Sequence, residues 1–359
     1  VLYKDLEFGY IATVDVASAV VMTIVAPLAA WAGLGFWSLV IERAAGVITR
    51  STMLWVVRRP WRPRWQFSTS MARWFLRFGG SVFATRGLTF LLDRFDDFWT
   101  GTVLGPTQLG YYSRAYEFAR YPRRVVANPI MAVFFPTFAK LQHNRLKLSQ
   151  AFYRVVGLIV RAGFLLAGAF MLVAPEFIRI FLGERWMPMA LTFRLMLIYT
   201  LLDPILNAAG QLTVAVGAPQ ARTWTKLAQL AFFVPAVIVG ARAWGIDGVA
   251  VAADLMLLIG MVSLFPQLRK WVDFSVRRML GFPLLGLALG LAAGFLVEQK
   301  FAPSSDWASL IIKAVAFTLP YSAVLLLLER REYRRNLQIL LDVMRSSRRK
   351  QASPVDGAL

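Results

Sequence analysis

The sequence has no cysteine and a single histidine, His143, among its 359 residues. Disulfides, thiol catalysis and metal sites built from cysteine and histidine are therefore excluded. Catalytic motifs are missing as well, because no P-loop, GxSxG, HExxH or paired-carboxylate glycosidase signature occurs anywhere in the chain. We therefore expect a protein that is not an enzyme and that uses no cofactor and no metal.

Charged residues are also scarce. They make up 17% of the chain, whereas about a quarter is usual in soluble domains, and 58% of the residues are hydrophobic. The apolar residues form many long runs, and the strict alternation of membrane barrel strands is absent. This composition predicts an all-α polytopic membrane protein.

About ten segments approach or exceed the ~20 residues that a helix needs to cross the hydrocarbon core. The third and fourth are the weakest by hydropathy, because charged residues interrupt them. The predicted spans are 9–30, 35–57, 75–96, 111–138, 155–175, 188–213, 224–240, 246–266, 280–297 and 307–328.

The net charge of +20 lies mostly in the short loops between apolar runs. This placement is typical of orientation signals and of contact with anionic lipid, so we do not expect a nucleic-acid partner. Alternate loops are rich in lysine and arginine, whereas the others hold only Arg179, Arg185, Arg242 and Lys300. The positive-inside rule then predicts a multi-pass protein with both termini in the cytoplasm.

The most informative segment runs from residue 78 to 142, where charges interrupt sequence of membrane length. Ionisable groups at membrane depth cost about 2.5–3.5 kcal/mol each, so they normally face a bundle interior or a wet cavity. A transport or binding path is the default interpretation. The charges are Arg86, Asp93, Arg94, Asp96, Asp97, Arg114, Glu117 and Arg120.

Three of these charges, Arg86, Asp93 and Asp97, fall on one side of a helix by their spacing. They could bind a polar head group or a coupling cation, or form a buried ion pair that sets helix register. The sequence leaves both interpretations open.

A second group of candidates is arginine-rich. Arg114 and Arg120, followed by Arg123 and Arg124, offer planar donor forks suited to phosphate, although interfacial anchoring beside tyrosines is the alternative. Arg161 and Arg194 are further intramembrane candidates for substrate binding. Asp203 precedes Pro204 in mid-span, where proline frees a backbone carbonyl, and is a candidate for ion coupling or a hinge, with a packing kink as the alternative. Asp96 is a further candidate for ion coupling or buried pairing.

In the ninth span, Gly281, Gly286, Gly290 and Gly294 include two GxxxG spacings. Small residues at this spacing are typical of closely packed membrane helices.

The series Asp96…Gly101…Gly105…Leu109-Gly110-Tyr111…Ala115…Pro122…Pro136 resembles a pattern of bacterial polysaccharide flippases. These proteins belong to the multidrug/oligosaccharidyl-lipid/polysaccharide exporter superfamily. RFGG (77–80), FLGERW (181–186) and GIDGVA (245–250) extend the resemblance. Spacing to Gly101 matches the family's aspartate to Asp96, whereas the helical stripe favours Asp97.

The resemblance implies two inverted bundles of about six helices each, often followed by an extra pair. On this chain, about four helices would precede Val1. The implied regions are 1–57 (end of the first bundle), 58–74 (basic linker), 75–266 (second bundle), 267–328 (extra pair) and 329–359 (basic tail).

The implied function is a flippase of the inner membrane for undecaprenyl-pyrophosphate-linked oligosaccharide in polysaccharide assembly. Its partners would be that lipid-linked substrate, membrane lipids and other assembly proteins. A drug/cation antiporter on the same fold is the first alternative, but it should favour acidic cavity residues. A membrane glycan polymerase is the second, but it usually needs a longer extracytoplasmic loop than this chain offers.

Overall fold

The computed structural model describes residues 8–57, 68–300 and 305–329, and within these ranges every regular element is a helix. The all-α fold predicted from the sequence is thereby confirmed. Most of the predicted basic linker, and the tail after residue 329, lie outside the described residues. The chain forms two compact units, Val1–Phe78 and Gly79–Leu359, which are described separately.

The first unit contains a helical hairpin of α1 (Phe8–Trp31) and α2 (Trp37–Thr52), and α2 runs on into a π-helical turn at Met53–Val57. Gly33 and Gly35 form the connection with positive φ angles of 83° and 49°. The two helices are tied together by a hydrogen bond of 2.9 Å from the Ser18 hydroxyl to the Gly46 carbonyl. A side chain at Gly46 would displace the side chain of Met22, so glycine favours the close approach of the helices there.

Helix α3 (Thr69–Trp99) leads from the first unit into the second. The second unit continues with α4 (Pro106–Ala119), α5 (Asn128–Leu141), α6 (Arg145–Phe181), α7 (Ala190–Ala215), α8 (Pro219–Leu268), α9 (Val276–Lys300) and α10 (Asp306–Leu328). Six helices of the described residues are long and apolar enough to cross a membrane: α1, α6, α7, α8, α9 and α10.

The expected span 111–138 is not one continuous α-helix. Helix α4 ends at Ala119, a π-helical turn follows at Arg123–Ala127, and α5 begins at Asn128. Pro122 and Pro129 lie on either side of this turn, and proline removes a backbone donor and clashes with the preceding turn. The backbone is therefore irregular next to the charged residues.

Helix α8 is a hairpin of two helices, as the separate predicted spans 224–240 and 246–266 require. The chain reverses at Trp244 and Gly245, which leave helical geometry, and the φ angle of Gly245 is +59°. The two halves approach so closely at Gly240 and Gly248 that a side chain on either would meet the backbone of the other.

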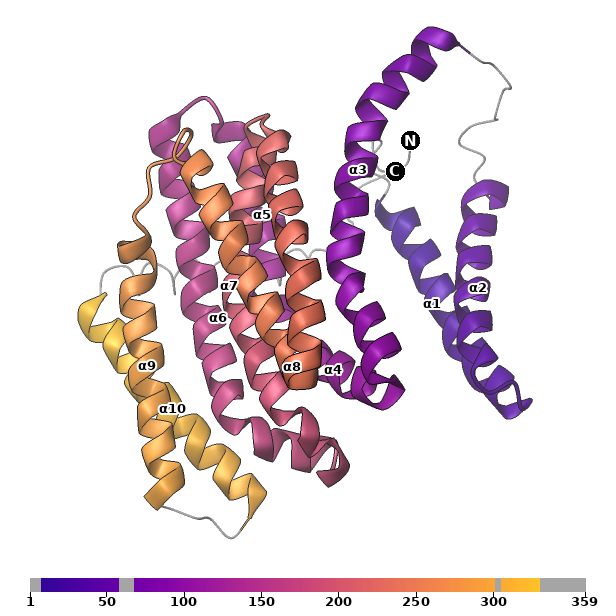
Figure 1. Cartoon of the computed structure of the whole chain (residues 1–359). Coiled ribbons are helices and arrows are strands. Elements are labelled where there is room, and N and C mark those ends of the chain that lie inside the picture. The colour runs from indigo at the N-terminus through magenta and orange to yellow at the C-terminus, as the bar shows by residue number, and fades with distance from the viewer. Residues whose placement is uncertain (1–7, 58–67, 301–304, 330–359) are drawn as a thin grey trace, which may run out of the picture. The chain divides into compact units, whose positions relative to one another are not determined.

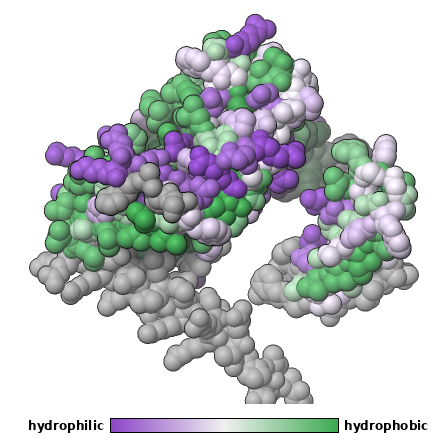
Figure 2. Space-filling view, turned by 90° about the horizontal axis from the view of Figure 1, so that it is seen from below, coloured by the Kyte–Doolittle hydropathy of each residue, from purple (hydrophilic) through white to green (hydrophobic). Residues whose placement is uncertain are grey.

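Helix α6 is the central element of the second unit and packs against α5, α7, α9 and α10 (Figure 1). The predicted small-residue packing on α9 holds for Gly286, Gly290 and Gly294, which lie against Tyr321, Phe317 and Leu172; Gly281 faces open space. In the end-on view of Figure 2, hydrophilic residues gather in a band across the larger unit, with hydrophobic residues beside it. This distribution suits a bundle with apolar sides and polar ends.

Candidate functional site

A polar cavity of about 580 Å³ lies between the C-terminal half of α3, helix α4 and the π-helical turn that follows it. Its wall carries three acidic and three basic side chains. The lining residues are Phe90, Asp93, Arg94, Asp97, Ser113, Tyr116, Glu117, Arg120 and Arg123.

The connection between α3 and α4 shapes this cavity. Helix α3 ends in a π-helical turn, Thr100–Leu104, and the chain then reverses at Gly105, whose φ angle is +91°. Pro106 starts α4, a position where its missing N–H costs nothing. The sharp reversal brings the carboxylates of α3 opposite the polar residues of α4.

Asp96 and Asp97 have different surroundings. Asp96 is buried and accepts a hydrogen bond of 2.6 Å from the hydroxyl of the fully buried Tyr112. It also accepts one of 3.0 Å from the backbone N–H of Asp97. The side chain of Asp97 lines the cavity and lies 3.4 Å from Arg94. Asp96 therefore ties α3 to α4, and Asp97 is the neighbour that faces the cavity.

Some charges around the cavity are already paired. Glu117 lies 2.8 Å from Arg124, and Arg123 reaches Asp203 on α7, with 2.6 Å between Nη1 and Oδ2. This second approach is an ion pair whose angles do not meet hydrogen-bond geometry. The cavity charges are thus connected to α7 through Arg123.

Two cavity charges have no ion pair and no hydrogen bond to any described residue: Arg120 and Asp93. The guanidinium of Arg120 lies 5.1 Å from the centre of the Tyr116 ring, which in turn packs edge-on against Tyr199 at 5.9 Å. Cation–π contact orients a guanidinium without neutralising it. Arg120 and Asp93 therefore have no close ion partner among the described residues and can bind groups that enter the cavity.

Helix α8 adds basic residues to this region. Lys226 and Arg222 lie close enough to Asp203 to interact with it electrostatically, and Lys226 also interacts with Asp93. Sequence reasoning missed Lys226 because it stands near a span end, where a lysine is ordinarily an interfacial anchor. Its proximity to Asp93 depends on the packing of α8, which leaves no local signal.

The structure brings some of the predicted site residues together and separates others. Asp93, Asp97 and Arg120 line the cavity, and Asp203 reaches it through Arg123. Among the remaining candidates, Arg86 and Arg114 are exposed on α3 and α4. Arg194 donates a hydrogen bond of 3.1 Å to the Met171 carbonyl.

Arg161 belongs to a different cluster, on α6. Its guanidinium is buried and makes two hydrogen bonds, of 2.7 and 2.6 Å, to the carboxylate of Glu329. Farther along α6, Glu176 accepts hydrogen bonds from Lys313 at 2.7 Å and from Ser309 at 2.8 Å, and Lys313 also contacts Glu298. The buried pairs join α6 to α10 and to the residue that follows it, and the contact with Glu298 joins α10 to α9.

The apolar helices and the polar cavity define a multi-pass helical membrane protein. Residues 1–191 match the family described as "Polysaccharide biosynthesis protein". The chain belongs to this family.

Curated relatives agree with the match. The chain is 26% identical to the lipopolysaccharide biosynthesis protein WzxC of Escherichia coli, over 77% of this chain and 57% of that protein. It is 27% identical to the succinoglycan biosynthesis transport protein ExoT of Rhizobium meliloti, over 99% and 72%. The chain thus spans little more than half the length of the first relative.

A solved structure has the same fold. The lipid II flippase MurJ, in an inward closed conformation, superposes with a TM-score of 0.67 over 87% of this chain and 67% of MurJ, at 13% sequence identity. The arrangement of the helices in this chain is therefore similar to that in MurJ.

Proposed function

We propose that this protein is a flippase that moves undecaprenyl-pyrophosphate-linked oligosaccharide across the bacterial inner membrane for polysaccharide assembly. Membership of the polysaccharide biosynthesis family and similarity to a succinoglycan transport protein support the substrate class. In this proposal both termini are cytoplasmic, as the charge of the loops predicts.

The observation that carries the proposal is the polar cavity beside α4, set among apolar helices. A lipid-linked sugar needs a wet path for its polar head and a hydrocarbon path for its tail. The unpaired guanidinium of Arg120 offers donors to pyrophosphate oxygens, with Arg123 beside it. Asp93, Asp97 and Ser113 offer acceptors and a hydroxyl to the sugar.

Alternating access around this cavity is the proposed mechanism. The head group would bind when the cavity opens to the cytoplasm, and rocking of one bundle against the other would expose it outside. The regions predicted from the sequence serve this scheme: 1–57 would contribute to the opposing bundle, 75–266 would form the bundle with the cavity, and 267–328 would add the extra helix pair. Asp93, Asp97 and Asp203 are the candidates for ion coupling.

The proposed roles of the other predicted residues follow from where they lie. Arg86 and Arg114, exposed on α3 and α4, would meet the substrate only if a further part of the transporter closed over them. Arg161 and Arg194 would act through helix position, since both are held by groups of their own unit.

A drug/cation antiporter is the second candidate, favoured by the three carboxylates Asp93, Asp97 and Glu117 on the cavity wall. An antiporter site for cations should hold an excess of acid, whereas here Arg94, Arg120 and Arg123 balance it. The balance favours a zwitterionic or anionic head group with sugar hydroxyls.

The test is deletion of the gene in its native host, with the later steps of the pathway intact. Lipid extracts examined by mass spectrometry should contain accumulated lipid-pyrophosphate-linked repeat units that stay on the cytoplasmic face, and the intact gene should relieve the accumulation. Normal pools of lipid-linked sugar together with altered drug susceptibility would instead support the antiporter.

A further inference from the structure

A second pocket, separate from the cavity of the proposed function, lies at the start of α6. Its volume is about 410 Å³, within the range of about 300–1,000 Å³ that is common for small-ligand sites. It is formed by the first turns of α6 and the loop between α8 and α9. The lining residues are Leu146, Ser149, Gln150, Tyr153, Arg154 and Asp273.

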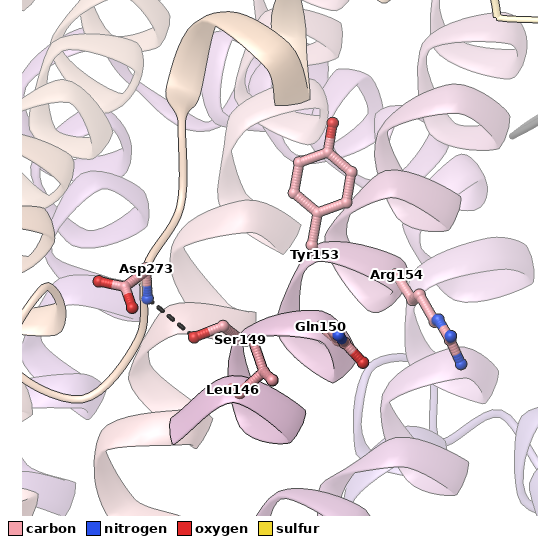
Figure 3. Close-up of a pocket in the computed structure, with 6 residues that line it drawn as sticks. All are labelled: Leu146, Ser149, Gln150, Tyr153, Arg154 and Asp273. Carbon is pink, nitrogen blue, oxygen red and sulfur yellow. Dashed lines mark hydrogen bonds between the residues drawn. The ribbon is translucent and has the colours of Figure 1, made fainter. Parts of the chain in front are cut away.

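The loop side of this pocket is firmly held. The backbone N–H of Asp273 donates a hydrogen bond of 2.9 Å to the Ser149 hydroxyl (Figure 3). Arg145 binds both carboxylate oxygens of Asp273, at 3.1 and 2.7 Å, and also the Arg269 carbonyl at 3.0 Å. Asp273 is thus neutralised by Arg145, and the loop is fixed against α6.

The charge that remains at the pocket is positive. Asp273 is the one acidic residue in segments 140–155 and 266–280. Arg154 makes no ion pair or hydrogen bond with any described residue, and Figure 3 shows its side chain extending to the side opposite Asp273. The same two segments carry further exposed basic residues: Lys147, Arg269, Lys270, Arg277 and Arg278.

Apolar surface adjoins this basic pocket. Leu146, on the pocket wall, is 70% exposed. The predicted spans 155–175 and 280–297 start within a few residues of Arg154 and Arg278, so the pocket lies at the level where the apolar helices begin. Tyr153, whose hydroxyl donates to the Arg278 carbonyl at 3.1 Å, is a residue type common at membrane interfaces.

We propose that this pocket binds the phosphate head group of an acidic membrane phospholipid, with Arg154 as the principal contact. A phosphodiester supplies the negative charge that the unpaired guanidinium lacks, and the acyl chains would continue along the exposed apolar surface. A soluble anion would satisfy the charge but leave Leu146 in water. The inference does not rest on the proposed transport of lipid-linked sugar.

The test is native mass spectrometry of the full chain in detergent, titrated with dioleoyl-phosphatidylglycerol or dioleoyl-phosphatidylcholine. The unchanged protein should retain phosphatidylglycerol more tightly than phosphatidylcholine. Arg154→Gln should weaken phosphatidylglycerol binding about fivefold, the effect of one basic residue near a lipid surface. The matched control is Arg242→Gln, which removes an exposed arginine at the turn of the α8 hairpin and should change nothing.

Equal retention of the two lipids by the unchanged protein would overturn the proposal, and so would an equal loss in both variants. Displacement of phosphatidylglycerol by millimolar inorganic phosphate would show a general phosphate site and would also overturn it. If Arg154→Gln fails to fold, photoactivatable phosphatidylglycerol added to the unchanged protein supplies the answer. Labelled peptides should include residues 145–154, and labelling confined to other helices would refute the site.

Discussion

The charges of this protein fall into two regions that treat them in opposite ways. Around α6 and α10, buried charged side chains are paired with one another, as in the bidentate pair of Arg161 and Glu329 with its contact of 2.6 Å. Around α3 and α4, Arg120 and Asp93 face a cavity without an ion partner in the described part of the chain. The two regions look alike in sequence, because in both of them charged residues interrupt apolar stretches.

The difference shows that a charge in an apolar helix does not by itself mark a binding site. A buried charge needs a partner, because leaving it unpaired costs several kcal/mol. When the partner comes from the protein, as for Lys313, the charge holds helices together. When a charge lines a polar cavity and no described residue pairs with it, as for Arg120, the charge is available to a ligand.

The largest loss of stability is expected from breaking a buried ion pair between α6 and α10. Lys313→Met removes the partner of the buried Glu176 and should lower the free energy of unfolding by about 3–5 kcal/mol. Chemical denaturation in detergent measures it. The double variant Lys313→Met with Glu176→Met should recover most of the loss, since no buried charge is then left alone. A loss below about 1 kcal/mol in the single variant would show that Lys313 is not needed to neutralise Glu176.

A smaller loss of stability is expected from removing the hydrogen bond that joins α3 to α4 beside the cavity. Tyr112→Phe deprives the buried carboxyl of Asp96 of its hydroxyl donor and should cost about 2 kcal/mol. The adjacent Tyr111→Phe is the matched control, because the Tyr111 hydroxyl makes an exposed bond to the Arg185 carbonyl. Equal losses in the two variants would contradict a structural role for Asp96.

Arg120→Gln should have the opposite effect to these two variants: it should impair transport and leave stability almost unchanged. We expect at least a tenfold fall in transport, equivalent to about 1.4 kcal/mol, and a stability change within about 0.5 kcal/mol. Accumulation of lipid-linked repeat units in cells reports the first, and denaturation the second. Arg242→Gln, which removes an exposed arginine at the turn of the α8 hairpin, is the control and should leave transport nearly unchanged. A large loss of stability in Arg120→Gln would show that Arg120 has a structural role, like the buried ion pairs of α6 and α10.

The smallest effect is expected for Arg94→Gln. Its contact with Asp97 is long, at 3.4 Å, and the Arg94 side chain is 66% exposed. Ion pairs of this kind contribute at most about 1 kcal/mol and often nothing measurable. Denaturation at low and high salt should give curves that overlap with those of the unchanged protein. A loss of stability that is equal at low and high salt would contradict this expectation, because it would show that the Arg94–Asp97 pair is shielded from solvent.

Sequence patterns predicted part of the candidate site. The helical spacing of Asp93 and Asp97 placed both on one face, and both line the cavity. The same spacing included Arg86, which is exposed on α3 and is not among the residues that line the cavity. Arg123 was grouped with the arginines of this segment, but its partner Asp203 is 80 residues away along the chain. No local period can report a pair at that separation.

The sequence alone determined the membrane class, most helix positions and the family resemblance. Long apolar runs have few structural solutions in a bilayer, because every backbone polar group must be satisfied within the segment. Only the tertiary structure decided which charged side chains are paired within the protein and which face the cavity without an ion pair to a described residue. Arg161 pairs with Glu329 across 168 residues, whereas Arg120 lies over the Tyr116 ring and makes no ion pair with a described residue. Helix packing sets these partnerships, and packing depends on the shape of whole helices rather than on the spacing of residues along any one of them.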